Sequence, residues 1–302
     1  MSLKNTIRTV ILFIAVFLLF QLIGTIFAYI FNSDLIMTMA SFMIFAAIFN
    51  FGAYLLSDKL VLATYRARIV DREEVPELYS IVEDVAFNME VPTPKVAIIP
   101  TEVPNAFATG RNSKKAVVAV TRGLLRILDK KELRGVIAHE MAHIKNRDTL
   151  IMTVSATIAS AISFAARMIY WSSFFRPVSR DRNESGLLYL LIAIIAAVTI
   201  PLAAMLIHLA ISRTREYEAD YRGAVSIRDP LSLARALEKI EYYVQRRPLT
   251  YGNPATSHLF IVNPFRGAKL STLFSTHPPT EERIRRLEEL AREMRFSLRE
   301  HL

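Results

Sequence analysis

Residues 136–143 read VIAHEMAH, with two histidines four positions apart and a glutamate next to the first. On a helix, positions i and i+4 share one face, so His139 and His143 can present two imidazoles to a single metal ion. Glu140 lies beside them, where it can act as general base toward a water molecule. A surface helix with two incidental histidines is the alternative, but two of only six histidines fall in this pattern. The stretch therefore predicts a metal centre on a helix.

The flanking residues support a helix and narrow the choice of metal ligands. Asp129 and Glu132 have capping-box spacing, which predicts a helix that begins near Lys130. No proline or glycine interrupts residues 136–146, although residues 146–148 could break the helix. Because the chain has no cysteine, any metal must be held by His, Asp or Glu. Zinc suits two imidazoles and a carboxylate, with one position open for water.

A third ligand is expected near residues 212–220, which read SRTREYEAD. If this stretch is helical, Glu216 and Asp220 share a face at i, i+4. One carboxylate could bind the metal, and the other could orient a ligand histidine through its second ring nitrogen. From spacing alone Glu216, Glu218 and Asp220 all remain candidates, and an ordinary charge cluster beside a membrane is the alternative.

Long apolar runs dominate the rest of the chain, which is 52% hydrophobic with a net charge of +9. The runs cover residues 9–31, 35–56, 151–171 and 187–211. Each has about the 20 residues that a helix needs to cross a bilayer. Buried core helices and, for the first run, a cleaved signal peptide are the alternatives. The runs favour a membrane protein over a nucleic-acid-binding protein as the explanation of the positive charge.

The order of the runs predicts a topology. Only residues 32–34 separate the first two runs, so they should form a tight hairpin, and the last two should form a second one. Both termini and the large polar segments then share one side of the membrane. Basic residues near the runs concentrate there, at Lys4, Arg8, Lys59, Arg66, Arg68, Lys145, Arg147, Arg213, Arg215 and Arg222. Only Arg176, Arg180 and Arg182 lie opposite, which places the shared side in the cytoplasm.

The expected fold is mainly α-helical with a small β-sheet (α+β), with four transmembrane helices and a cytoplasmic domain. Its segments are a transmembrane hairpin (1–56), a cytoplasmic half with the metal-binding helix (57–150), a second hairpin (151–211) and a second cytoplasmic half (212–302). Residues 96–100 and 116–120 read as short strands, and residues 121–128 as a short helix. Asp229 and Thr280 are expected to cap later helices, and residues 248–272 read as a loop.

Four motifs resemble the HtpX-type proteases of the M48 metallopeptidase family. They are the HEMAH stretch, residues 212–220, the segment PNAFATG at 104–110 and the segment STHPP at 275–279. The four-run layout matches as well. The resemblance implies a gluzincin-like zinc site in a zincin-like domain, in which the first Glu of a Glu-x-x-x-Asp motif is the third ligand. Carried over, that ligand is Glu216, with Asp220 as its supporting residue.

Two further segments are candidates for substrate or transition-state contacts. Asn105, Ala106 and Phe107 precede a strand, and an extended substrate could pair with their backbone, although a plain turn is the alternative. His277 lies beside two prolines and could stabilise an oxyanion, or it could simply pack at a helix entry. His208, inside the fourth run, is expected to pack or to hydrogen-bond a neighbouring helix.

The sequence thus predicts a zinc-dependent endopeptidase with one Zn²⁺ held by His139, His143 and Glu216, and Glu140 as general base. The resemblance implies membrane or misfolded proteins as substrates and the plasma membrane of a prokaryote as location. The expected partners are polypeptides and the lipid bilayer, without nucleic acid. The main alternative is an inactive membrane scaffold or holdase, which should have lost Glu140. A zinc transporter would need more ionisable residues within the runs.

Overall fold

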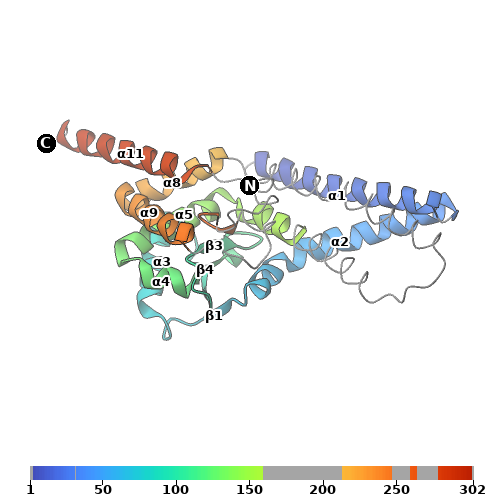
Figure 1. Cartoon of the computed structure of the whole chain (residues 1–302), viewed down its shortest axis with the longest axis horizontal. Helices are drawn as coiled ribbons and strands as arrows, with labels where there is room; N and C mark the ends of the chain where they lie inside the picture. The colour runs from blue at the N-terminus through green and yellow to red at the C-terminus, as the bar shows by residue number, and fades with distance from the viewer. Residues whose placement is uncertain (1–2, 31, 159–212, 247–258, 264–277, 301–302) are drawn as a thin grey trace.

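The computed structural model describes residues 3–30, 32–158, 213–246, 259–263 and 278–300. In chain order, the elements are α1 (Leu3–Ile30), α2 (Leu35–Thr64), β1 (Arg68–Val70), α3 (Pro76–Asn88), β2 (Lys95–Ile99), β3 (Ala106–Thr109), η1 (Ser113–Lys115), β4 (Val117–Thr121), α4 (Arg122–Ile127), α5 (Lys130–Asn146), α8 (Arg213–Ile227), α9 (Pro230–Arg246) and α11 (Thr280–Glu300). Figure 1 shows a long helical hairpin that projects from a domain in which helices cover a sheet.

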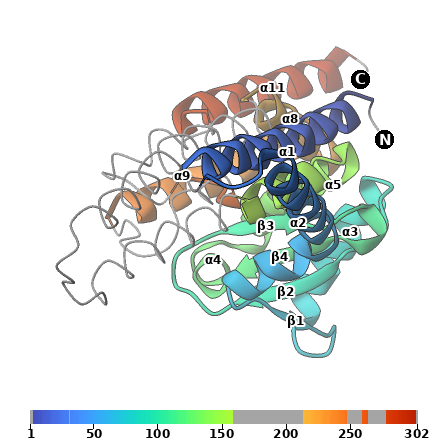
Figure 2. The ribbon, with the colours of Figure 1, turned by 90° about the vertical axis from the view of Figure 1, so that its right-hand side faces the viewer.

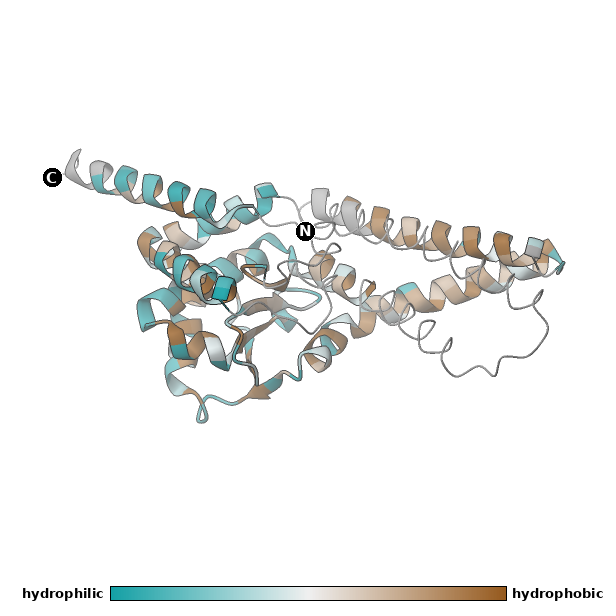
Figure 3. Ribbon diagram, viewed as in Figure 1, coloured by the Kyte–Doolittle hydropathy of each residue, from teal (hydrophilic) through white to brown (hydrophobic). Residues whose placement is uncertain are grey.

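The hairpin of α1 and α2 confirms the first predicted pair of apolar helices. The turn before α2 is capped by Asp34, whose Oδ1 accepts a hydrogen bond of 2.8 Å from the backbone N–H of Met37. Both helices are long and apolar enough to cross a membrane, with mean hydropathies of 2.8 and 1.9 (Figure 3). Only 22% and 6% of their apolar windows are buried, so they are not core helices of a globular domain.

The second hairpin falls mostly outside the described residues. The described helix Thr149–Ile158 begins two residues before the predicted third run and is apolar. Ile151, Met152 and Val154 pack against Leu12 and Val16 of α1. Residues 159–171 and 187–211 are not described, so two helices that could span a membrane are found in the described part of the chain, and the other two remain predictions.

A four-stranded sheet forms the floor of the domain. Its strand order is β1-β2-β4-β3, with β2 parallel to β4 and the two outer strands antiparallel to their neighbours. The predicted strands at 96–100 and 116–120 correspond to β2 and β4, whose Val-rich and Ile-rich sequences suit a buried sheet. The sequence analysis did not assign β1, and it expected the segment of β3 to lead into a strand. Figure 2 shows β3 as the edge strand on the side of α5.

Helices from both polar segments share one hydrophobic core on this sheet. The core joins residues of α3, α5, α8, α9 and α11 with β2 and β4. The predicted caps of two helices are present: Asp129 and Glu132 form a capping box at the start of α5, and Asp229 Oδ1 accepts a hydrogen bond from Ser232 at the start of α9. Thr280, the predicted cap of the last helix, is the first residue of α11, and its hydroxyl donates to Glu241 of α9.

The metal-binding helix and the third apolar run are separate helices. Helix α5 ends at Asn146, and Arg147 caps it in the left-handed conformation with φ at 61°. Asp148 follows, and the next helix begins at Thr149. The bend at Arg147 and Asp148 comes directly after the turn of α5 that carries His143. The apolar helix therefore does not continue the axis of α5.

Candidate metal centre

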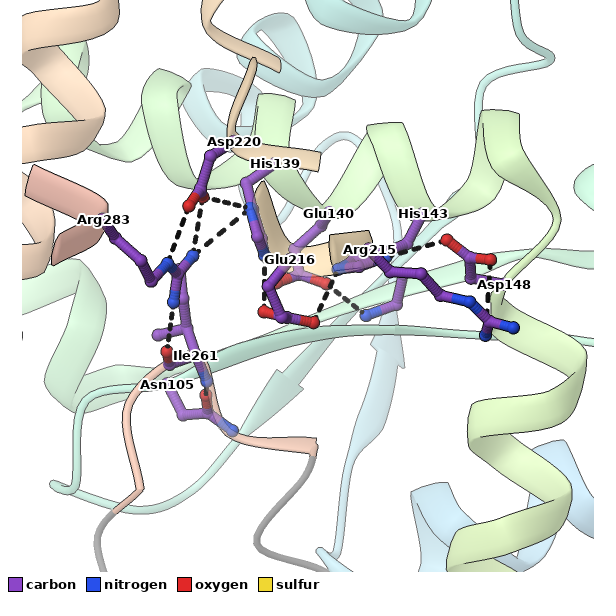
Figure 4. Close-up of polar contacts among 11 residues, drawn as sticks. Asn105, His139, Glu140, His143, Asp148, Arg215, Glu216, Asp220, Ile261 and Arg283 are labelled. Atoms are coloured by element: carbon purple, nitrogen blue, oxygen red, sulfur yellow. Dashed lines mark hydrogen bonds and ion pairs between the residues drawn. The ribbon is translucent and has the colours of Figure 1, made fainter. Parts of the chain in front are cut away.

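The structure brings His139, His143 and Glu216 together inside the domain. The two imidazoles come from one face of α5, and Glu216 comes from the first turn of α8, which packs on α5. His139 Nε2 lies 3.7 Å from Glu216 Oε2, and His143 Nε2 lies 3.6 Å from Glu216 Oε1. Figure 4 shows Glu216 facing both imidazoles. All three side chains are buried, with at most 2% of their surface exposed.

The geometry of these three side chains suits a zinc ion. One ligand atom from each residue can be chosen so that all three lie within 4.8 Å of one another. Atoms about 2.0–2.1 Å from one zinc in tetrahedral geometry lie about 3.3 Å apart, close to the observed nitrogen–oxygen distances. Two imidazoles and a carboxylate leave a fourth position open, as in catalytic zinc sites. The donor set therefore fits zinc.

A glycine allows the two helices to approach closely enough for this arrangement. A Cβ at Gly223 of α8 would lie 2.9 Å from the carbonyl carbon and oxygen of Ala138 and from the nitrogen of His139. Only a hydrogen side chain fits at that contact. The backbone of α8 therefore lies directly against the turn of α5 that carries His139, and this contact sets where Glu216 stands relative to the imidazoles.

We expect Gly223→Ala to push α8 away from α5 and so to weaken zinc binding at the centre. The added methyl group has no room against the backbone of α5, and overpacking of this kind costs about 1–3 kcal/mol. The variant should unfold at a lower temperature and bind zinc more weakly than the natural chain. Gly52→Ala is the matched control, because a Cβ at Gly52 meets no atom within 4 Å. Unchanged zinc affinity in the Gly223 variant would show that helix spacing does not govern the site.

The second ring nitrogen of His139 faces a buried carboxylate from α8. His139 Nδ1 lies 2.9 Å from Asp220 Oδ1, and Arg283 of α11 pairs with the same carboxylate. Burial by itself would raise the pKa of Asp220, but the charge and hydrogen bonds of Arg283 outweigh it and lower that pKa to about 2. An ionised Asp220 accepts a hydrogen bond from the Nδ1–H group of His139. The unprotonated Nε2 is then free to bind a metal ion.

The carboxylate of Asp148 faces the second ring nitrogen of His143, as that of Asp220 does for His139. His143 Nδ1 lies 3.3 Å from Asp148 Oδ2, and Asp148 Oδ1 lies 3.6 Å from Arg215 of α8. Burial lowers the pKa of His143, but the hydrogen bond to Asp148 and the charge of Glu216 raise it to about 9. Both imidazoles therefore turn Nδ1 toward an aspartate and Nε2 toward Glu216 (Figure 4).

Glu140 lies between the imidazoles and the edge of the sheet. Its Oε2 accepts a hydrogen bond of 2.9 Å from the backbone N–H of Ala108 in β3. Burial raises the pKa of Glu140, and the neighbouring imidazoles oppose that shift. A carboxylate with a raised pKa beside the donor set is suited to take and return a proton.

The predicted substrate residues lie in β3 or just before it, the edge strand whose Ala108 is hydrogen-bonded to Glu140. Ala106 and Phe107 belong to β3 and are buried, with the ring of Phe107 packed on Tyr65. Asn105, just before the strand, uses its amide on the segment 259–263: Nδ2 donates to the carbonyl of Leu259, and Oδ1 accepts from the N–H of Ile261. Part of the expected loop 248–272 is therefore a buried segment that contacts the site.

Of the three carboxylates that the spacing allowed as third ligand, only Glu216 meets both imidazoles. Asp220 stands behind His139, and Glu218 points away and pairs with Arg222, with 46% of its side chain exposed. His277 and His208 lie outside the described residues, so their predicted roles are not tested.

Three polar residues of the centre are not predicted by the sequence patterns: Asp148, Arg215 and Arg283. Arg283 left a signal, because it lies four and seven residues before Leu287 and Leu290 and so falls on the apolar face of α11. A charged residue on such a face needs a buried partner. The pairing of Asp148 with His143 depends on the bend at Arg147, which the sequence only suggested.

The arrangement is that of a metallopeptidase site with two histidines and one glutamate. The model of the family described as Peptidase family M48 matches residues 72–291, so the chain belongs to this family. The match runs from before α3 to residue 291 within α11 and therefore covers every described residue of the centre.

Several similar proteins are named "Protease HtpX homolog", and two of them illustrate the extent of the similarity. One, from Thermococcus sibiricus, is 57% identical over 248 residues, which cover 81% of this chain and 84% of the relative. The other, from Persephonella marina, is 51% identical over 293 residues, which cover 96% and 99%. Among solved structures, the crystal structure of S. mikatae Ste24p aligns with 90% of this chain and 62% of its own length, at 17% identity and a TM-score of 0.45. The chain thus resembles HtpX-type proteases over most of its length.

Proposed function

We propose that this chain is a membrane-anchored, zinc-dependent endopeptidase that hydrolyses peptide bonds of membrane or misfolded proteins. The observation that carries the proposal is the convergence of His139, His143 and Glu216, with Glu140 beside them. The family membership and the names of the relatives support the same class of reaction.

Each residue has a distinct task in the proposed mechanism. His139, His143 and Glu216 hold the metal. When bound, zinc polarises the scissile carbonyl and lowers the pKa of water toward about 7. Glu140 takes the proton of the attacking water and delivers it to the leaving amine, while the N–H of Ala108 holds its carboxyl group through Oε2. Asp220 and Asp148 keep the two imidazoles oriented.

The outer edge of β3 is the proposed substrate surface. An edge strand offers backbone groups with which an extended polypeptide can pair, whatever its side chains are. Because Glu140 is hydrogen-bonded to Ala108 of this strand, a substrate on the edge would pass beside the general base. His277 remains a proposed contact for the oxyanion.

We place the domain on the cytoplasmic side of a prokaryotic plasma membrane, because basic residues flank the apolar runs on the side shared by the polar segments. The end of α2 packs on the sheet through Val61 and Leu62, and the bend at Asp148 leads from α5 into the apolar helix 149–158. These contacts support a position of the centre beside the membrane-facing end of the domain. Cytoplasmic loops and tails near the bilayer are therefore the proposed targets.

The proposal predicts zinc-dependent cleavage by the purified full chain in detergent micelles. An unfolded soluble polypeptide should be cut at internal positions, a chelator should abolish cutting, and added Zn²⁺ should restore it. The products, read by mass spectrometry, would show whether internal bonds are cleaved. Cleavage that persists at full rate after verified removal of the metal would rule out this function, and an inactive zinc-bound chain would favour the scaffold alternative.

A further inference from the structure

Arg283 is a fully buried arginine in the first turn of α11, with 1% of its surface exposed. Buried guanidinium groups are rare, because removing the charge from water costs several kcal/mol unless it is paired and hydrogen-bonded. In this domain the pairing is extensive. Its Nε donates to Asp220 Oδ2 at 2.8 Å, its Nη2 donates to Asp220 Oδ1 at 2.7 Å, and its Nη1 donates to the carbonyl of Ile261 at 2.8 Å.

The two parallel contacts to Asp220 need the planar fork of an arginine. A guanidinium presents two N–H groups to one carboxylate in fixed geometry, whereas the ammonium group of a lysine is a point charge on a flexible stem. The fork therefore fixes both the position and the rotation of the Asp220 carboxylate. A further N–H of Arg283, on Nη1, donates to the carbonyl of Ile261, whose own N–H donates to Asn105.

Asp220 passes this constraint to His139. Its Oδ1 lies 2.9 Å from His139 Nδ1 and also accepts from Arg283. The guanidinium lies 3.5 Å from the same Nδ1, because both groups approach one oxygen (Figure 4). With Nδ1 committed as a donor to Asp220, the opposite nitrogen Nε2 faces Glu216 and is free to bind a metal.

We propose that Arg283 is a positioning residue of the peptidase site, which holds Asp220 so that His139 keeps Nε2 turned toward the metal position. The proposal rests on the proposed function in one respect, that the cluster binds zinc. It assigns to α11 a direct part in the metal centre, although Arg283 lies 63 residues beyond Asp220 of α8 in the sequence. A purely structural arginine would support the core and leave the imidazole untouched.

The test compares Arg283→Lys with Arg285→Lys in the full chain. Arg285 lies on the same helix, but it is exposed and pairs only with Glu282 and Glu289 among the contacts described. The measurement is zinc affinity, by competition with a chromophoric chelator, together with the unfolding temperature of the metal-free protein. We expect Arg283→Lys to weaken zinc binding by about 10–100-fold, as changes in residues that orient ligands do, and Arg285→Lys to leave it unchanged.

A double-mutant cycle with Asp220→Asn separates positioning from general support. If Arg283 acts through Asp220, the Arg283→Lys change should weaken zinc binding little further once Asp220 is Asn. Equal losses in both backgrounds, or lower stability with unchanged zinc affinity, would overturn the proposal. Arg283→Gln, which keeps a planar donor without charge, replaces the Lys variant if that chain does not fold. Absence of zinc binding in the natural chain would instead refute the proposed function.

Discussion

Glu140→Gln should abolish peptide hydrolysis while leaving the fold and the bound zinc intact. The glutamine is nearly isosteric and still offers an oxygen to the N–H of Ala108, so the contact between α5 and β3 should survive. It cannot take a proton from water at neutral pH. Since general acid–base catalysis contributes about 10²–10⁴-fold, we expect the turnover number to fall by at least that range. Turnover on an unfolded polypeptide, measured beside zinc content, checks this expectation.

The zinc content and unfolding temperature of the Glu140→Gln chain are its internal controls. Both should match the natural chain, because Glu140 is expected to act on water and not to hold the metal. Loss of zinc together with activity would instead make Glu140 a ligand. Retained turnover with full zinc occupancy would remove Glu140 from the role of general base.

Glu216→Gln should strip the metal, because a neutral amide replaces the carboxylate whose two oxygens each face one of the imidazoles. We expect zinc affinity to drop by more than about 100-fold, beyond the 10–100-fold range typical of residues that only orient ligands. Activity should fall with occupancy and recover in part at high zinc concentration. Zinc affinity measured by chelator competition is the direct readout.

Glu218→Gln is the matched control for that experiment. It lies two residues further along α8, makes the same chemical change, and faces solvent beside Arg222. Its zinc affinity should equal that of the natural chain within about twofold, since exposed ion pairs contribute little. If Glu218→Gln loses the metal and Glu216→Gln keeps it, the third ligand is Glu218, on another face of α8, and the assignment of Glu216 is wrong.

Local signals account for what could be predicted from the sequence. The capping box at Asp129, the Val-rich strands β2 and β4 and the apolar runs of α1 and α2 each depend on a few neighbouring residues. The i, i+4 spacing of His139 and His143 likewise needs only a helix. The choice of Glu216 over Glu218 came from the family resemblance, because spacing alone allowed both.

Features that depend on contacts between distant segments could not be predicted in this way. The hydrogen bonds of Asn105 to residues 259–261 join positions more than 150 apart in sequence. The pairing of Arg283 with Asp220 requires the packing of α11 against α8, which no local pattern defines. Arg147 adopts a left-handed conformation usual for glycine, so the bend that brings Asp148 to His143 had only a weak sequence signal.

Anomalous X-ray scattering at the zinc absorption edge, from crystals of the full chain, would locate the metal directly. We predict one strong peak bounded by Nε2 of His139, Nε2 of His143 and the carboxylate of Glu216, with Asp220 and Asp148 still facing the two Nδ1 atoms. A zinc ion held by other side chains, or a peptidase-active crystal form with no zinc at this position, would contradict it.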